Sequence, residues 1–268
     1  IRRIVNMATE KWSDLTARLG SAAAMVLVGS VGIWLGGLGF HVLVALICGL
    51  MVWELVGILR PAGGQAQSLL GGLTGAAVLL SVYLPVGFAL PLLLGPALVG
   101  FGQLARNRTI YMVFTVMILM TGFGMIQVRD EMGVSWMMWL VTVVIVTDVV
   151  GYFAGRMIGG PKFWPAVSPK KTWSGTTAGW IGAALVGLFF ALYANVGLQL
   201  IGVSVAVSMA SQMGDISESA MKRKMGIKDS SNLIPGHGGL LDRFDGMLGA
   251  SVFLLIMGQF IGFPPGLG

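Results

Sequence analysis

The stretch HVLVALICGLMVWELVGIL, residues 41–59, contains one ionised side chain, Glu54, in an otherwise apolar run. An apolar run of about 17 to 25 residues is long enough to cross the ~30 Å hydrocarbon layer as an α-helix. The chain contains about nine such runs, at residues 21–38, 41–59, 67–84, 86–104, 109–128, 134–155, 176–194, 197–217 and 246–263. We therefore predict an all-α, polytopic integral membrane protein with about nine transmembrane helices.

The composition supports the same class of protein. Of the 268 residues, 56% are hydrophobic, 10% are charged and 41 are glycine. This combination is typical of membrane helices that approach closely at small residues, and it argues against a soluble enzyme. Residues 1–268 are interpreted as one membrane domain, with 1–20 as an interfacial helix before the first span. Two long polar connections, 159–175 and 219–245, are the expected catalytic loops.

Positive charge predicts the orientation of the spans. If the N-terminus is cytosolic, nearly all Lys and Arg residues fall on the cytosolic side, and Arg129 lies opposite. The net charge of +6 is then a topological signal combined with phosphate binding, and nucleic acid is not an expected partner. We expect a multi-pass protein of the inner (cytoplasmic) membrane whose active site faces the cytosol.

The block SAMKRKMGIKDSSNLIPGHGGLLDRFD, residues 219–245, gathers much of the charge of the chain. Each ion placed in a bilayer costs roughly 2.5 to 3.5 kcal/mol on insertion scales. A polar block of this density therefore indicates function. Glycines around His237 suggest a backbone that approaches a ligand closely, and the basic cluster suggests phosphate.

The order of residues in this block is specific. It reads Ser219, Met221, Lys222, Arg223, Lys228, Asp229, Ser231, Ile234, Pro235, His237, Gly238, Gly239, Leu240, Asp242, Arg243, Phe244 and Asp245. In this pattern the chain resembles the phosphatidate cytidylyltransferases, also called CDP-diacylglycerol synthases. The resemblance extends upstream through DVVGYFAGRMIGG (148–160) and SPKKTWSG (168–175). Many members carry an acidic or amide residue where this chain has Ser174, so this position is given no role.

The resemblance implies an enzyme that transfers the cytidylyl group of CTP to phosphatidate, giving CDP-diacylglycerol and pyrophosphate. It implies Mg²⁺ as the cofactor, with room for a second cation. The partners implied are CTP, phosphatidate, the lipid bilayer and a second copy of the chain in a homodimer.

Three carboxylates are the expected metal ligands. On a helix, Ser219 and Lys222 follow Asp215 on roughly the same face, at i+4 and i+7. Mg²⁺ is usually held by one or two carboxylates with phosphate oxygens and water, and the resemblance assigns this role to Asp215 and Asp242. Asp245 is a third candidate, although it is also readable as a helix cap or the partner of an arginine. Taken alone, Asp215 is also readable as a hydrated helix end.

The expected catalytic residues are Asp215, Asp242, Lys222, Arg223, Lys228, Asp229 and His237. Arginine offers a two-pronged fork to phosphate and lysine a point charge, so the three basic residues are predicted to bind the triphosphate or the lipid phosphate. They are also readable as ordinary cytosolic charges of a membrane protein. His237 is either a phosphate contact or proton carrier, or a residue that orders its loop.

The substrate-binding residues implied by the resemblance are Asp148, Tyr152, Ser168, Lys170, Lys171, Thr172, Ser219, Gly238, Gly239 and Arg243. Asp148 is also a candidate by itself, because a carboxylate inside a membrane span is costly. The basic loop before Trp173 has a simpler reading as an interfacial anchor. Glu54 and Arg60 are expected to form a structural ion pair near the end of the second span.

Two other function classes fit parts of the sequence. Asp242, Asp245 and Gly246 spell the start of a CDP-alcohol phosphotransferase motif, but the following MLGASVFLLIMG contains no further acid. A secondary transporter would carry polar residues at the membrane midplane in two related halves. Here the polar residues gather at one face, which favours chemistry at the membrane surface.

Overall fold

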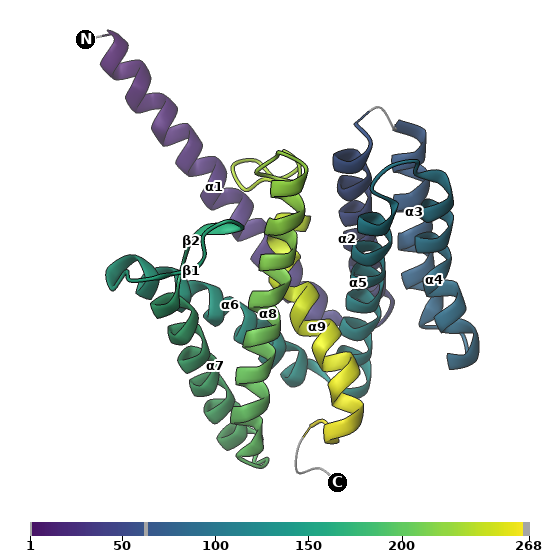
Figure 1. Ribbon diagram of the computed structural model, residues 1–268. Helices are drawn as coiled ribbons and strands as arrows, with labels where there is room; N and C mark the ends of the chain where they lie inside the picture. Colours follow the sequence, from purple (N-terminus) through teal and green to yellow (C-terminus); the bar gives the residue numbers. More distant parts are fainter. Residues whose placement is uncertain (1, 62–63, 265–268) are drawn as a thin grey trace.

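The computed structural model describes residues 2–61 and 64–264 (Figure 1). The helices are α1 (Arg2–Leu35), α2 (Gly37–Leu59), α3 (Gly64–Ser81), α4 (Val86–Gln103), α5 (Arg108–Gln127), α6 (Val134–Met157), α7 (Trp173–Tyr193), α8 (Gln199–Lys224) and α9 (Leu241–Ile261). A π-helix, η1 (Val128–Met132), joins α5 to α6. Strands β1 (Lys162–Trp164) and β2 (Ser168–Thr172) form an antiparallel hairpin between α6 and α7.

Each predicted span corresponds to one of these helices, and the all-α membrane class is confirmed. In the described residues, six helices are long and apolar enough to cross a membrane: α2, α5 extended by η1, α6, α7, α8 and α9. The apolar parts of α1 and α4 are shorter than these, and α3 begins with polar residues, Gln65 and Gln67. Length and hydropathy therefore do not confirm nine spans.

The main differences from the predicted boundaries are at the end of α8, the start of α9 and the start of α1. α8 continues to Lys224, beyond the predicted end at residue 217, because its last polar turns pack against α9. The loop between α8 and α9 is therefore residues 225–240, which is shorter than the predicted 219–245. α1 is continuous from Arg2 to Leu35, so the predicted interfacial segment 1–20 is helical where described but is not a separate element.

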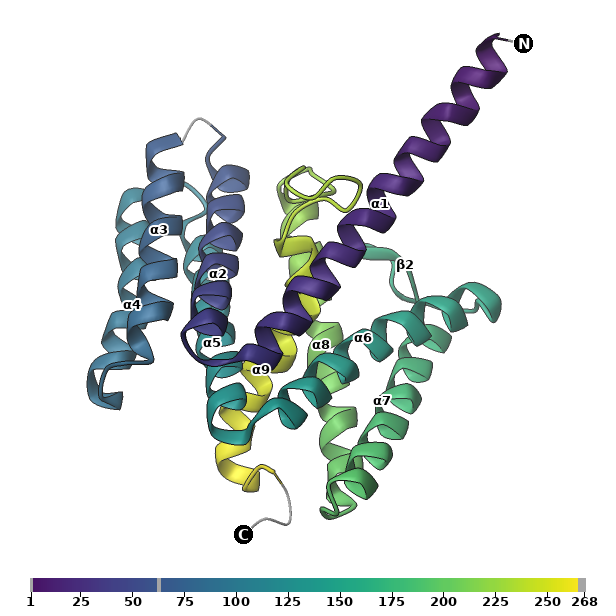
Figure 2. The same cartoon turned by 180° about the vertical axis from the view of Figure 1, so that it is seen from behind.

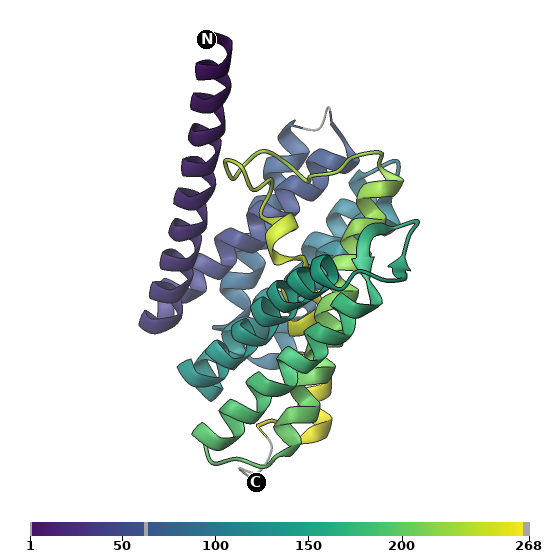
Figure 3. The ribbon, with the colours of Figure 1, turned by 90° about the vertical axis from the view of Figure 1, so that its left-hand side faces the viewer.

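α9 is the central helix of the structure. It contacts α2, α5, α6 and α8, and so joins a group formed by α2 to α5 to a second group formed by α6 to α8 (Figures 1 and 2). α1 contacts α2 and α6, and its N-terminal half projects away from the other helices (Figure 3). The residues at the start of α9 therefore meet side chains from both groups.

α8 and α9 cross at glycine. A Cβ atom on Gly249 would collide with the carbonyl oxygen of Ala210, and one on Gly214 would collide with that of Asp245. Small residues at such a crossing let two helix backbones approach closely. The polar last turns of α8 are in this way held directly beside the first turns of α9.

The opposite end of the bundle, around η1, is closed by internal polar contacts. His41 Nε2 lies 2.7 Å from Asp130 Oδ2, and His41 Nδ1 lies 2.8 Å from the hydroxyl of Tyr83. Arg129 donates from Nε to the carbonyl of Ile33 near the end of α1, at 2.5 Å. These groups are satisfied by the protein itself, which gives this end a structural role.

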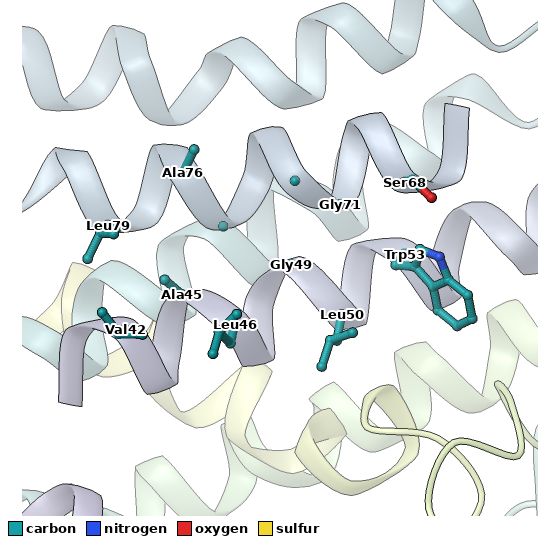
Figure 4. A pocket seen from close by; sticks show the side chains of 12 residues that line it. Val42, Ala45, Leu46, Gly49, Leu50, Trp53, Ser68, Gly71, Ala76 and Leu79 are labelled. Atoms are coloured by element: carbon teal, nitrogen blue, oxygen red, sulfur yellow. The ribbon is translucent and has the colours of Figure 1, made fainter. Parts of the chain in front are cut away.

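A groove of about 430 Å³ runs between α2 and α3 (Figure 4). Its lining is apolar, with Leu46, Leu50 and Trp53 from α2 and Leu79 from α3, and it includes no charged residue. This cavity therefore offers no groups for catalysis.

The crossing of α8 and α9 predicts opposite effects for two alanine substitutions in α9. Gly249→Ala should lower the melting temperature, because overpacking a tight contact typically costs about 1 to 3 kcal/mol. Gly258→Ala is the control, since its Cβ would lie 3.7 Å from Phe263 Cβ, an ordinary contact, and alanine favours helix. Tryptophan fluorescence during heating of the detergent-solubilised protein measures the melting temperature of each variant. Equal melting temperatures would contradict a tight crossing.

Candidate active site

The polar stripe predicted on α8 forms in the structure: Ser219 donates to Asp215, Asp215 pairs with Lys171 of β2, and Lys222 pairs with Asp242 of α9. The two helices run antiparallel, so Gly214 lies beside Gly249, and the following turns of α8 meet Asp245 and then Asp242 of α9. Glu218 interacts electrostatically with both aspartates. This face therefore brings together acids that are distant in the sequence.

Lys222 bridges two of these acids. Its Nζ lies 2.5 Å from Glu218 Oε2 and 2.7 Å from Asp242 Oδ1. The Glu218 side chain is fully buried, and its Oε1 has no hydrogen-bond partner among the described residues. Lys222 thus compensates two buried carboxylates, and this contact does not require a bound substrate.

Asp242 also organises the loop 225–240. Its Oδ2 accepts hydrogen bonds from the backbone N–H and the hydroxyl of Ser230 and from the backbone N–H of Gly239, each at 2.8 Å. Gly238, which precedes Gly239, has φ +81°, a conformation that glycine adopts without strain. The two glycines after His237 therefore allow the chain to turn back onto Asp242.

Glu54 of α2 is a site residue whose partner the sequence did not predict. It is 2% exposed, and its carboxylate accepts hydrogen bonds from Ser230, Ser231, Leu240 and Leu241. The predicted ion pair with Arg60 is wrong, because Glu54 points to the loop and Arg60 is exposed at the helix end. The available signal was a lone acid in an apolar run.

A cavity of about 470 Å³ lies between α6, the hairpin, α7 and α8. Four basic residues line it: Arg156, Lys162, Lys170 and Lys171. The acids Asp148 and Asp215 line it as well, together with Tyr152, Thr172 and Gln212. The two upstream segments that carry the family resemblance thus meet α8 at one cavity.

Lys171 connects this cavity to the acidic face of α8. It forms an ion pair with Asp215, whose other oxygen accepts a hydrogen bond from Ser219 at 3.2 Å. Asp148, Asp215 and Asp245 interact electrostatically with one another, and Asp148 also interacts with Lys171. The predicted residues of the cavity and of α9 therefore form one continuous charged region.

Some predicted substrate-binding residues have internal partners. The hydroxyl of Thr172 accepts a hydrogen bond from Gly175 N at 3.2 Å and so caps α7. The Tyr152 hydroxyl accepts from Arg156 at 3.0 Å. Ser168 pairs with Trp164 in the hairpin and does not line the cavity. Thr172 therefore both caps α7 and lines the cavity, whereas Ser168 lies in the hairpin outside the cavity.

Other predicted residues lie on α8, on α9 and on the loop between them, outside the lining of the cavity. Arg223, Lys228, Asp229 and Arg243 are exposed, and Arg243 Nε donates to the carbonyl of His237 at 3.0 Å. His237 Nδ1 lies 2.8 Å from the hydroxyl of Ser21 in α1. This contact favours the reading in which His237 orders the loop, here against α1.

The expected metal ligands are near one another but are paired with lysines. Asp215 pairs with Lys171 and Asp242 with Lys222, whereas one oxygen of Asp245 accepts from its neighbour Gly246 N at 2.7 Å. In the described part of the chain, no group of three or more His, Cys, Asp or Glu side chains has the geometry of a metal site.

Comparison with known proteins gives matches over nearly the whole chain. The sequence profile described as the cytidylyltransferase family matches residues 16–261. A phosphatidate cytidylyltransferase of Brucella abortus (strain 2308) is 33% identical over 269 residues, covering 94% of this chain and 96% of its own. Proteins of the same name are 37% identical in Bacillus subtilis (strain 168), over 49% of this chain and 51% of that protein, and 38% identical in Staphylococcus epidermidis (strain ATCC 12228), over 54% and 59%.

The Lys222 bridge predicts a large loss of stability when the charge is removed. Lys222→Met leaves Glu218 and Asp242 buried without a cation, and breaking a buried pair in this way typically costs about 3 to 5 kcal/mol. Lys224→Met is the matched control, because Lys224 is exposed in the same last turn. Thermal unfolding in detergent should show a much lower melting temperature for Lys222→Met alone. Similar curves for both variants would argue against the bridge.

Proposed function

The chain belongs to the cytidylyltransferase family, and we propose that it transfers the cytidylyl group of CTP to phosphatidate, giving CDP-diacylglycerol and pyrophosphate. The observation that carries this proposal is the 470 Å³ cavity, which four basic residues line beside Asp148 and Asp215. A cavity of this charge suits the triphosphate of a nucleotide. Relatives of the same length that carry the name phosphatidate cytidylyltransferase support the lipid substrate.

The reaction requires little covalent chemistry from the protein. An oxygen of the phosphatidate phosphate attacks the α-phosphorus of CTP, and the bond from that phosphorus to the bridging oxygen breaks as pyrophosphate leaves. The attacking phosphate is already ionised, so no strong general base is needed. Lys162, Lys170 and Lys171 hold the triphosphate in the cavity and stabilise the charge of the departing pyrophosphate.

Mg²⁺ is part of this proposal, with Asp215, Asp242 and Asp245 as the residues that would hold it. The donor set fits a hard cation, because all three are carboxylates and one Asp245 oxygen accepts no hydrogen bond from the described residues. Asp215 and Asp242 already form ion pairs with lysines, so the proposed metal site accommodates positive charge. When bound, the ion would neutralise charge on the nucleotide phosphates. A second cation is an extension of the same proposal.

The membrane arrangement is also a proposal: nine spans, an inner-membrane location, a cytosolic active site and a homodimer. The connections after α2 and α4 and the loop 225–240 lie at the same end of the bundle (Figure 1). This end carries Arg60, Arg106, Arg108 and the basic end of α8, which supports its assignment to the cytosol. The homodimer rests on the family resemblance.

The direct test is an assay with purified protein, CTP labelled in the cytosine, phosphatidate and Mg²⁺. We expect a labelled liponucleotide and one pyrophosphate for each turnover. Diacylglycerol is the control acceptor, because it lacks the phosphate that attacks. A CDP-alcohol phosphotransferase would form no liponucleotide from CTP and phosphatidate, so absence of any labelled lipid would refute the proposal.

The carboxylate assignment predicts that Asp215→Asn and Asp242→Asn each reduce turnover to near background. Each change removes the negative charge that holds the cation, while the amide keeps the shape of the side chain. Glu131→Gln is the control, since Glu131 is exposed on η1 away from the cavity. Turnover at several Mg²⁺ concentrations measures the effect, with melting temperature as the check on folding. A variant that keeps normal turnover at low Mg²⁺ would remove that residue from the metal site.

The proposed orientation predicts sided labelling of introduced cysteines. In a Cys48→Ala background, Asn232→Cys on the exposed loop should react with an impermeant thiol reagent from the cytosolic side only. Asn195→Cys, exposed between α7 and α8, should react from the other side only. Intact cells and inverted vesicles provide the two sides. The reverse pattern would overturn the topology and with it the access of CTP.

A further inference from the structure

The carboxylate of Glu54 reaches from α2 into the loop that precedes α9. Its Oε1 accepts from Ser231 Oγ at 2.6 Å and from Leu240 N at 2.9 Å, and its Oε2 accepts from Leu241 N at 2.8 Å. We infer that Glu54 is a positioning residue for the cytidylyl transfer, which fixes the start of α9 and through it Asp242 and Lys222. This inference rests on the proposed function.

The first turn of α9 needs such a partner. The first backbone N–H groups of a helix have no acceptor within the helix, and a side-chain oxygen at the N-cap usually satisfies one of them. Here the N-cap is Leu240, whose side chain cannot accept a hydrogen bond, and no side-chain cap is present. Glu54 supplies the acceptor from another helix, and its negative charge is also favourable at the positive end of the α9 dipole.

Glu54 and Asp242 hold the loop from two sides. The hydroxyl of Ser230 lies 3.3 Å from Glu54 Oε2 and 2.8 Å from Asp242 Oδ2. Gly239 lies between the two carboxylates, because a Cβ atom there would be 2.6 Å from Glu54 Oε1 and would collide with Ser230 Oγ. The second glycine after His237 is therefore required by the approach of Ser230 and Glu54, and a shift of Glu54 would move the N–H that binds Asp242.

The position of Glu54 also explains why an acid is tolerated in α2. An ionised carboxylate buried in an apolar bundle is costly unless hydrogen bonds satisfy it. Glu54 is 2% exposed, and its partners come from the loop and from α9. The group of helices α2 to α5 is thus connected to the charged face of α8 and α9 through this side chain.

The test compares Glu54→Gln with wild type. The amide keeps the shape but loses the charge and one acceptor atom, so we expect kcat to fall roughly tenfold to a hundredfold, in line with the loss of charge-assisted hydrogen bonds. KM for CTP should change much less, because the cavity that binds the nucleotide is separate. Trypsin should cleave after Lys228 faster than in wild type, since the loop is held less firmly.

Glu131→Gln is the matched control and should leave kcat and the cleavage rate unchanged. A fall in kcat without faster cleavage, or a lower melting temperature with normal kcat, would overturn the positioning role. If Glu54→Gln does not fold, Glu54→Asp provides the test. Aspartate keeps the charge but is shorter, so both kcat and the protection of the loop against trypsin should decrease. Wild-type values of both would overturn the inference. If wild type forms no liponucleotide, the proposed function fails, whereas the cleavage rates still test whether Glu54 holds the loop.

Discussion

The ion bridge from Lys222 to Glu218 and Asp242 constrains the rest of the structure. Buried charges of this kind are stable only when an opposite charge lies at close range. α8 and α9 must therefore lie close enough for a lysine on one helix to reach an acid on the other, and the crossing at Gly249 allows this approach. Because α9 also contacts α2, α5 and α6, this crossing determines where both groups of helices meet.

Local sequence features predicted much of this arrangement. Each apolar run predicted a helix because run length and hydropathy are properties of a single segment, and the spacing of Asp215, Ser219 and Lys222 predicted one polar face for the same reason. The cavity, too, is lined by residues from the two segments that carry the resemblance. Run length alone did not predict the number of spans, because the apolar parts of α1 and α4 are short and α3 begins with polar residues.

Contacts between distant segments could not be predicted from one sequence. The partner of Glu54 lies more than 170 residues away in Ser230, so proximity along the chain pointed instead to Arg60. Lys171 and Ser168 are close in sequence and share a hairpin, yet only Lys171 lines the cavity, whereas Ser168 pairs with Trp164 at the other end of β2. Such outcomes depend on how elements pack, which the sequence pattern of one element does not contain.

The pairing of carboxylates with lysines explains how so many charges persist in an apolar chain before a substrate binds. Asp215 pairs with Lys171 and Asp242 with Lys222, so two of the three acids proposed to hold a metal already have a positive partner. A nucleotide that enters with a divalent cation brings both charge types, phosphate for the lysines and metal for the carboxylates. Exchange of the internal pairs for these new ones would leave each lysine and each carboxylate beside an opposite charge, which limits the desolvation cost of binding at the membrane surface.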